Sequence, residues 1–297
     1  MYYNENTIIY FNGAFIKATE ARCNVYDQSL HYGYAAFEGI RSYATQHGVR
    51  IFKAKEHYER MKFSCNAIGI PYPFNNDELI ESSYEVLRRN NLDDAYLRPI
   101  VTCSPNMGLT KGIDSQVIIT AWKWNAYLGD KLLNLYTSSY RRITPASFKV
   151  EAKISGHYVN SILAAQEAKD KGYDEALLLD TEGYVAEGPG ANIFMESNGI
   201  LYTPQRGSIL PGITRNTVIE LCSLLDIDVH EKKISPEELK EADSAFYCGT
   251  AAEIIGVASV DKKQFPKPWN ESIGAVIQKA YKQLVLEKEF RSAETAA

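Results

Sequence analysis

Strand-like patterns of apolar and polar side chains occur in two regions near the N-terminus, residues 7–18 and 37–52. Strand-like Thr7–Phe11 and Ala14–Ala18 flank Asn12-Gly13, a residue pair typical of tight hairpin turns. This pattern predicts a hairpin over residues 7–18. A second pair of strands is expected at 37–43 and 49–52, joined by a turn near residues 46–48.

Apolar residues then recur every three or four positions, which indicates a helix over residues 55–68 that ends at Gly69. Its apolar face is formed by Tyr58, Met61, Cys65 and Ile68, and is bordered by His57, Arg60 and Ser64. A second helix is expected at about 77–90, followed by strands at 94–103 and 116–124.

The second half of the chain mixes short strands with three longer helical patterns. Helices are expected at about 155–171, 213–225 and 269–287, and we expect the first to bury Val159, Ile162 and Leu163 and to end at Gly172. Strands are expected at 132–139, 175–180, 184–186, 192–196, 200–203, 244–248 and 254–260.

A chain of 297 residues is long enough for about two domains. The stretch 125–131, which contains Gly129, is the expected interdomain loop. The expected division is a small N-terminal domain over 1–124 and a large domain over 132–297.

Composition narrows the possible functions. The formal net charge is −5 and no basic cluster stands out, so we expect no nucleic-acid partner. No apolar stretch is long enough to span a bilayer, and the N-terminus has no signal-peptide pattern. The five cysteines are scattered, which argues against disulfides and structural zinc and favours the cytoplasm, and the histidines form no metal-binding cluster.

Four short motifs in the second half carry candidate chemistry. They are Lys153 just before a helix, the loop 187–192 that begins Glu187-Gly188-Pro189-Gly190, the helix start Leu210-Pro211-Gly212-Ile213-Thr214, and the turn Gly249-Thr250-Ala251-Ala252-Glu253. Together they supply an amine, an acid and two sets of backbone donors, one at a helix N-terminus where anions bind. This is the equipment needed to hold a phosphorylated pyridine aldehyde, so the chain has the features of a pyridoxal phosphate (PLP) enzyme.

The ordered set resembles the fold type IV PLP enzymes, and most closely the branched-chain amino acid aminotransferases. The resemblance covers nearly the whole chain. Its first-half motifs are Leu30-His31-Tyr32-Gly33, Phe37-Glu38-Gly39-Ile40-Arg41, Glu56-His57-Tyr58-Glu59-Arg60, Ala95-Tyr96-Leu97-Arg98-Pro99 and Ala126-Tyr127-Leu128-Gly129. It implies an α+β, two-domain fold, in which a smaller N-terminal α/β domain precedes a larger domain with a mostly antiparallel, barrel-like sheet flanked by helices.

The resemblance also implies roles for individual residues. Lys153 matches the catalytic Schiff-base lysine and Glu187 the partner of the pyridine nitrogen. The other cofactor-binding positions are Arg60, Tyr158, Ile213, Thr214 and Thr250. The substrate-binding positions are Tyr32, Phe37, Gly39, Tyr96, Arg98, Trp124, Tyr127, Thr250 and Ala251. In the family, Tyr32 and the loop around Met107-Gly108-Leu109 reach a neighbouring subunit's site, which implies a homodimer or hexamer.

The sequence departs from the family at two places. Between the lysine and the tyrosine stand Ile154, Ser155, Gly156 and His157 where two glycines and an asparagine are common, and Ala191 replaces a common glutamate. We interpret His157 as a helix-start residue. Neither departure changes the lysine or the pyridine partner, so both bear on fine specificity.

The implied reaction is ping-pong transamination of branched-chain L-amino acids (Leu, Ile, Val) with 2-oxoglutarate. Alternatives on the same scaffold are a D-amino acid or (R)-amine transaminase and an aminodeoxychorismate lyase. The Tyr96-x-Arg98 and Phe37-x-Gly39 pairs favour the L-enzyme. A non-catalytic PLP-binding protein is disfavoured because the acid, the base and the carboxylate-binding groups are all present.

Overall fold

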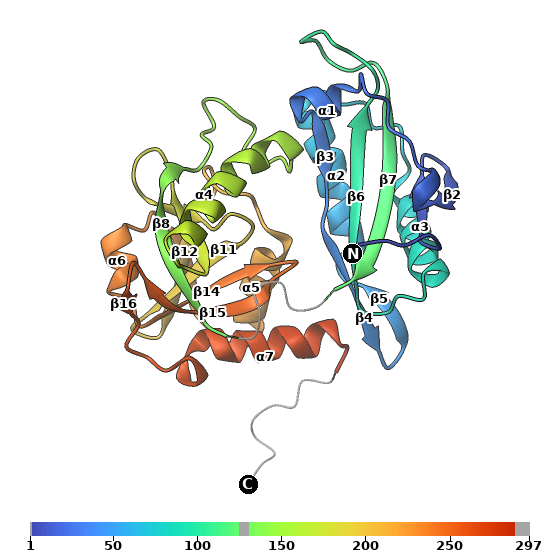
Figure 1. Ribbon diagram of the computed structural model, residues 1–297. Coiled ribbons are helices and arrows are strands. Elements are labelled where there is room, and N and C mark those ends of the chain that lie inside the picture. The colour runs from blue at the N-terminus through green and yellow to red at the C-terminus, as the bar shows by residue number, and fades with distance from the viewer. Residues whose placement is uncertain (1, 125–130, 289–297) are drawn as a thin grey trace. The chain divides into compact units, whose positions relative to one another are not determined.

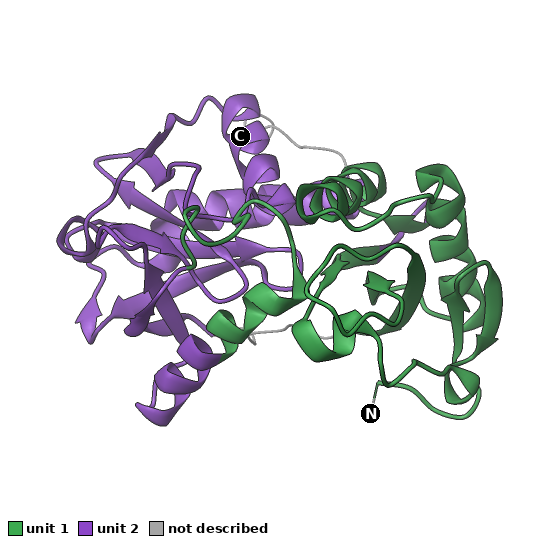
Figure 2. Cartoon of the chain, turned by 90° about the horizontal axis from the view of Figure 1, so that it is seen from above, with its two compact units in different colours: residues 1–42, 49–125, 143–162 green, residues 43–48, 126–142, 163–297 purple. Residues whose placement is uncertain are grey.

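The computed structural model describes residues 2–124 and 131–288, which fold into two compact units. Figure 2 shows unit 1 (1–42, 49–125 and 143–162) and unit 2 (43–48, 126–142 and 163–297) in different colours. The expected division at 125–131 falls, except for Lys131, outside the described residues and stays a prediction.

The units differ from the expected domains in two exchanged segments. Residues 143–162 were expected in the large domain but pack in unit 1, whereas 43–48 belong to unit 2. The reason lies in backbone pairing, because Ile154 forms a β-bridge with Ala36 and the Gly156 N–H donates to Gly33 O at 3.0 Å. These contacts join segments far apart in the chain, which a sequence pattern does not reveal.

Unit 1 is built on a sheet with the strand order β2-β1-β7-β6-β4-β5, in which β3 also pairs with β6 (Figure 1). The β1–β2, β1–β7, β3–β6, β4–β6 and β6–β7 pairs are antiparallel. The strand bounds are β1 (Ile8–Phe11), β2 (Ala14–Lys17), β3 (Ala35–Phe37), β4 (Ile40–Thr45), β5 (Gly48–Ile51), β6 (Ala95–Cys103) and β7 (Ser115–Lys123).

The helices of unit 1 include α2, which packs its predicted apolar face into the core of the unit. They are α1 (Gln28–Tyr32), α2 (Ala54–Ile68) and α3 (Asn76–Arg89), with a 3-10 turn over Ala18–Glu20. Tyr58, Met61 and Cys65 of α2 are fully buried, as the spacing predicts. The helix ends as predicted at Gly69, whose φ of 81° suits a residue without a Cβ.

Unit 2 contains a closed, barrel-like sheet. Its strand order is β10-β9-β8-β15-β14-β11-β12-β13, and β10 also pairs with β11, so six strands form a ring. The β8–β9, β8–β15 and β12–β13 pairs are parallel, and the remaining pairs are antiparallel. The bounds are β8 (Leu133–Arg141), β9 (Glu175–Leu179), β10 (Val185–Glu187), β11 (Asn192–Ser197), β12 (Ile200–Pro204), β13 (Val229–Lys232), β14 (Ser244–Gly249), β15 (Glu253–Val260) and β16 (Lys263–Gln264).

Four helices complete the described residues of the second half. They are α4 (Tyr158–Asp170), which begins in unit 1, and α5 (Ile213–Leu224), α6 (Pro236–Lys240) and α7 (Ile273–Val285) in unit 2. Two 3-10 turns precede α4 and α7, at Ser155–His157 and Trp269–Glu271. In the part of the chain that the structure describes, no helix combines the length and the apolar character needed to cross a bilayer.

The prediction for the buried face of α4 was wrong. Val159, Ile162 and Leu163 are 60%, 65% and 44% exposed, whereas the small residues Ala164 and Ala168 are fully buried. Ala164 and Ala168 share a core cluster with residues of β9, because small side chains let a helix lie close to a sheet. The spacing of apolar residues shows that a helix has an apolar face. It does not show whether other residues of the same chain cover that face.

Candidate active site

Lys153 is fixed through its backbone on both sides. Its N–H donates to the Ser64 hydroxyl of α2 at 2.9 Å, and its carbonyl accepts from the Phe37 N–H of β3 at 3.2 Å. Its Nζ donates to the Tyr158 hydroxyl at 2.5 Å and lies 4.8 Å from the centre of the Phe37 ring. The amine therefore points at the Tyr158 hydroxyl and lies near the rings of Phe37 and Tyr158. These contacts orient the amine and limit its contact with water.

Arg60 belongs to a buried charged cluster in the same unit. Glu38, which is fully buried, accepts from Arg60 Nε at 2.7 Å, from Arg60 Nη2 at 2.8 Å and from His57 Nδ1 at 2.7 Å. Burial alone would raise the pKa of Glu38, but Arg60 and His57 hold it well below its usual value. The two-point contact fixes the guanidinium plane of Arg60.

His57 is neutral at neutral pH in this cluster. Burial is the largest influence and lowers the pKa of His57, although the Glu38 carboxylate acts in the opposite direction. The charge of Glu38 is therefore balanced by Arg60, and Arg60 keeps its charge in spite of burial because Glu38 raises its pKa.

Aromatic rings surround Arg98. Its guanidinium lies 4.7 Å from the centre of the Phe37 ring, and its Nη2 donates to the Tyr96 hydroxyl at 3.3 Å. Tyr96 stacks on Trp124 with ring centres 4.7 Å apart. A Cβ added at Gly39 would lie 1.8 Å from the Tyr96 hydroxyl, so any other residue at that position would have to displace the Tyr96 ring.

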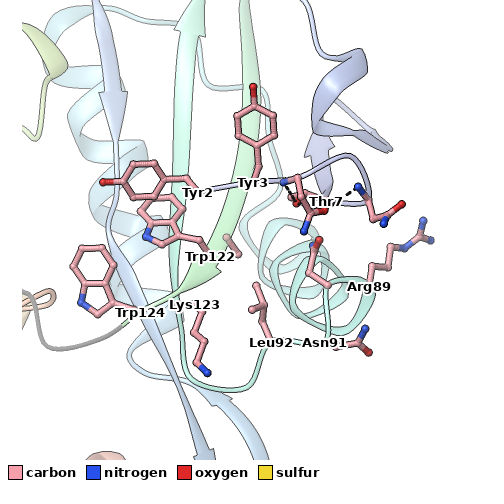
Figure 3. A pocket seen from close by; sticks show the side chains of 13 residues that line it. Tyr2, Tyr3, Thr7, Arg89, Asn91, Leu92, Trp122, Lys123 and Trp124 are labelled. Atoms are coloured by element: carbon pink, nitrogen blue, oxygen red, sulfur yellow. Dashed lines mark hydrogen bonds between the residues drawn. The ribbon is translucent and has the colours of Figure 1, made fainter.

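Trp124, which stacks on Tyr96, also lines a pocket of about 800 Å³ on unit 1 (Figure 3). Trp122 and Trp124 line it, and Tyr2 packs edge-on against Trp122 with ring centres 5.3 Å apart. These contacts hold the aromatic residues next to Arg98 in fixed positions.

In unit 2, Glu187 is held by three different groups. Only 4% of the residue is exposed, and its oxygens accept from Arg142 Nε at 2.5 Å, from Asn192 Nδ2 at 3.0 Å and from the Leu210 N–H at 3.1 Å. A carboxylate in such a setting is kept charged and oriented.

The helix start and the turn predicted to bind phosphate also lie in unit 2. Gly212 caps α5 without a side-chain hydrogen bond, and the first amides of a helix have no acceptor within the helix, which is the basis of anion binding at such ends. Thr250 and Ala251 lie in the turn between β14 and β15, which ends at Glu253. A Cβ added at Gly212 would lie 2.0 Å from Asn192 Oδ1, so the chain before α5 passes directly against the residue that holds Glu187.

The structure brings the predicted residues together within each unit. Unit 1 holds Lys153, Tyr158, Arg60, Tyr32, Phe37, Gly39, Tyr96, Arg98 and Trp124, and unit 2 holds Glu187, Ile213, Thr214, Thr250 and Ala251. Tyr32 is 44% exposed and donates to Met107 O at 3.0 Å, so it joins α1 to the loop around Met107. Tyr127 lies outside the described residues. His157 ends the 3-10 turn before α4, in agreement with its interpretation as a helix-start residue.

Sequence reasoning missed Arg142, Asn192 and Glu38 as functional residues. Asn192 and Glu38 stand inside the motifs that contain Glu187 and Gly39, and this position could have marked them as candidates. Arg142 is 45 residues from Glu187, and no local pattern connects them. In the described residues, no group of three His, Cys, Asp or Glu side chains is placed to hold a metal ion.

Comparison with known proteins identifies the family. The sequence profile of the family described as amino-transferase class IV matches residues 35–260. A branched-chain-amino-acid aminotransferase of Pseudomonas aeruginosa is 40% identical over 293 residues, which cover 97% of this chain and 95% of that protein. The enzyme of the same name from Escherichia coli K12 is 41% identical over 261 residues, which cover 85% of this chain and 84% of that protein.

Solved structures agree with the sequence comparison. A branched-chain aminotransferase from Thermoproteus uzoniensis, with norvaline, has a TM-score of 0.92 at 38% identity and covers 96% of both chains. A branched-chain amino acid aminotransferase from T.th., complexed with N-(5'-phosphopyridoxyl)-L-glutamate, has a TM-score of 0.91 at 36% identity and covers 96% of this chain and 95% of its own. The expected α+β architecture of fold type IV is confirmed, and the chain belongs to the class IV aminotransferases, which use pyridoxal phosphate.

Proposed function

We propose that this enzyme transfers the amino group of L-leucine, L-isoleucine or L-valine to 2-oxoglutarate, giving branched 2-oxo acids and L-glutamate. The observation that carries the proposal is the position of Arg98, over the Phe37 ring and bonded to the Tyr96 hydroxyl. The Phe37 ring offers an apolar surface to an aliphatic side chain, and the Arg98 guanidinium offers a positive charge to a second carboxylate. The names of the relatives, and the norvaline and glutamate ligands of two of the solved structures, support this choice.

The residues of the chain fit the cofactor. We assign the covalent linkage to PLP to Lys153, the contact with the phenolic oxygen of PLP to Tyr158, and the contact with its pyridine nitrogen to Glu187. The residues assigned to the phosphate are Arg60, Ile213, Thr214 and Thr250. The fit rests on the chemistry of the groups. Glu187 is a buried carboxylate whose charge is maintained by Arg142, and the first turn of α5 begins at a glycine with no side-chain cap. Asn192 donates to both Glu187 Oε2 and Leu210 O, which ties the acid to the start of α5.

The chemistry follows from these assignments. When bound, PLP supplies a ring that accepts the electron pair left behind when the substrate Cα–H bond breaks. Lys153 Nζ takes that proton and returns it, and the Tyr158 hydroxyl at 2.5 Å orients the amine. Glu187 holds a proton on the ring nitrogen by facing it with negative charge. The amino donor leaves as a 2-oxo acid before 2-oxoglutarate takes up the amino group, so the kinetics are ping-pong.

Substrate binding requires one pocket to accept two kinds of side chain. We assign the α-carboxylate to Tyr96, Thr250 and Ala251, and the side-chain pocket to Tyr32, Phe37, Gly39, Trp124 and Tyr127. When leucine is bound, Arg98 keeps the Tyr96 hydroxyl as its partner, so its charge is not left without polar contact. When 2-oxoglutarate is bound, the same guanidinium faces the distal carboxylate.

The enzyme works as a homo-oligomer in this proposal. The exposed stripe Val159, Ile162 and Leu163 on α4 is apolar, and so are Leu30 beside Tyr32 and Leu109 beside Met107, which are 67% and 87% exposed. Clusters of exposed apolar residues of this kind mark protein contacts. A second copy of the chain covers them and places Tyr32 and the Met107 loop near its partner's site.

The cytoplasm is the proposed location. All five cysteines are free thiols and four of them are buried, as suits a reducing compartment.

Amino-donor assays test the function directly. With 2-oxoglutarate as acceptor, L-leucine, L-isoleucine and L-valine are expected to give glutamate, whereas D-alanine and 1-phenylethylamine give little. A preference for either of the last two would favour the alternative transaminases. Conversion of 4-amino-4-deoxychorismate to 4-aminobenzoate and pyruvate would favour the lyase.

Arg98→Ala is expected to separate the two half-reactions. Because Arg98 faces only the distal carboxylate, its loss should raise KM for 2-oxoglutarate by about 10- to 100-fold, equivalent to the 1.5–3 kcal/mol of a hydrogen bond to a charged group. The leucine half-reaction should change much less. Single-turnover measurements of each half-reaction check this, and equal losses in both would refute the role of Arg98.

A further inference from the structure

A buried hydroxyl network in unit 2 has no assigned role in the reaction. Tyr281 of α7 is 2% exposed, and its hydroxyl forms hydrogen bonds with the side chains of Tyr43 and Thr214. Tyr43, which is 1% exposed, donates to Glu253 Oε1 at 2.9 Å. The network therefore runs from the first turn of α5 to the end of the β14–β15 turn.

Both ends of the network lie next to groups assigned to the cofactor phosphate. Thr214 is the second residue of α5, and Glu253 follows Thr250 by three residues in the turn. These two segments are 36 positions apart in the chain, and helix α7 packs against α5 and β15 (Figure 1). Tyr281 thus connects α7 to Thr214 directly and to Glu253 through the Tyr43 hydroxyl.

The backbone of Glu253, at the end of the turn, has an unfavourable conformation. Its φ is 55°, a left-handed conformation that residues other than glycine rarely adopt. Lys282, next to Tyr281 on α7, lies 3.2 Å from Glu253 Oε2. A disfavoured backbone conformation persists only where its surroundings hold it, and such residues cluster at ligand-binding turns. The bonds from Tyr43 and Lys282 supply that support.

We propose that Tyr281 is a positioning residue that sets the spacing between the two phosphate-binding segments, the first turn of α5 and the Thr250 turn. The inference rests on the proposed function, in which Thr214 and Thr250 bind the phosphate of PLP. Tyr281 itself does not touch the cofactor. It orients the Thr214 hydroxyl directly and holds the turn through Tyr43 and Glu253.

The inference is tested by comparing two ligands that differ only in the phosphate. The full-length chain, freed of cofactor, is titrated with PLP and with pyridoxal, and binding is followed by absorbance. Tyr281→Phe keeps the ring but removes the hydroxyl, and should weaken PLP binding about three- to tenfold, the effect of one net hydrogen bond. Pyridoxal binding should not change, because the network supports only the phosphate end.

Matched variants make the result specific. Tyr58→Phe also removes a fully buried tyrosine hydroxyl, which pairs with Ser83 at 2.6 Å in unit 1, and should leave both affinities unchanged. Tyr43→Phe should weaken PLP in the same direction as Tyr281→Phe, since it disconnects Glu253. If Tyr281→Phe does not fold, Tyr43→Phe tests the inference in its place.

The outcomes separate the inference from the function on which it rests. If the unaltered chain binds PLP no more tightly than pyridoxal, the assigned phosphate site is wrong. If the unaltered chain prefers PLP but Tyr281→Phe loses nothing, or loses the same factor for both ligands, the positioning role is refuted and the phosphate site stands.

Discussion

At the scale of single residues, Glu187 shows how a buried acid is kept charged. Arg142 supplies the compensating charge at 2.5 Å, and Asn192 and the Leu210 N–H supply further donors. A buried ion pair does not by itself add much stability, but losing one member leaves a charge in a poorly solvated site. The acid assigned to the pyridine nitrogen therefore depends on a residue that has no contact with substrate in this assignment.

Replacing Arg142 tests that dependence. Arg142→Met is expected to lower the free energy of unfolding by about 3–5 kcal/mol, because Glu187 is left buried without its cation. Urea unfolding measures the change. Arg141→Met, which alters the exposed neighbour, should cost much less. The double variant Arg142→Met, Glu187→Gln should recover part of the loss, and equal stabilities of the Arg141 and Arg142 variants would argue against the ion pair.

At the scale of elements, α2 connects the core of unit 1 with its charged cluster. One face buries Tyr58, Met61 and Cys65, and the bordering residues His57 and Ser64 are also buried. His57 contacts Glu38, and Ser64 holds the backbone of Lys153. A single helix thus positions both the assigned phosphate arginine and the assigned catalytic lysine.

The cluster on α2 predicts loss of stability in acid. Burial lowers the pKa of His57 from 6.5, so below that pH the unfolded chain binds a proton that the folded chain resists. Stability is therefore present above pH 6.5 and decreases as pH falls towards the lower folded pKa. Glu38, whose pKa is also lowered, adds a loss below its unfolded pKa of 4.5.

A substitution isolates the histidine contribution. His57→Gln keeps a donor for Glu38 but does not titrate, so its stability should fall less steeply than that of the unaltered chain between about pH 6.5 and 5, by at most about 1.4 kcal/mol per pH unit. Urea unfolding across this range measures the slopes. His31→Gln, at an exposed position, is the control, and identical slopes for all three proteins would contradict the assignment to His57.

At the scale of the whole molecule, the exposed apolar face of α4 is the surface that the proposed function assigns to a partner. The helix buries alanines against its own sheet and presents Val159, Ile162 and Leu163 outward. A second copy of the chain is the proposed partner, since Tyr32 and the Met107 loop contribute to a neighbouring site in the proposed function. Activity is therefore expected to depend on association.

Breaking the apolar face tests the dependence. Ile162→Glu places a charge on a residue that is 65% exposed in the single chain, so folding should be preserved while association is lost. Light scattering should show smaller particles, and transamination should fall at least about tenfold, as expected if burying the new charge costs more than 1.4 kcal/mol. Leu224→Glu, at a 73% exposed position on α5, should do neither. An active Ile162→Glu monomer would refute the shared site.

The sequence predicted the long elements well and the short ones poorly. Helices α2, α3, α5 and α7 follow apolar periodicities of several turns, and the hairpin β1–β2 follows its Asn12-Gly13 turn. Helices α1 and α6 have five residues each and β13 has four, too few to show a period. The same limit applies to the site, where Lys153 and Tyr158 were paired from one motif but Arg142 and Glu187 were not.

By itself, the sequence determined which chemical groups this protein has and where most of its helices and strands lie, because both depend on residues close together in the chain. The tertiary structure decided which groups are partners: Arg142 with Glu187, Glu38 with Arg60 and His57, and Tyr281 with Thr214. It also decided that α4 presents its larger apolar side chains outward. Such contacts form when the sheets close and helices pack on them, and the distance along the chain carries no information about them.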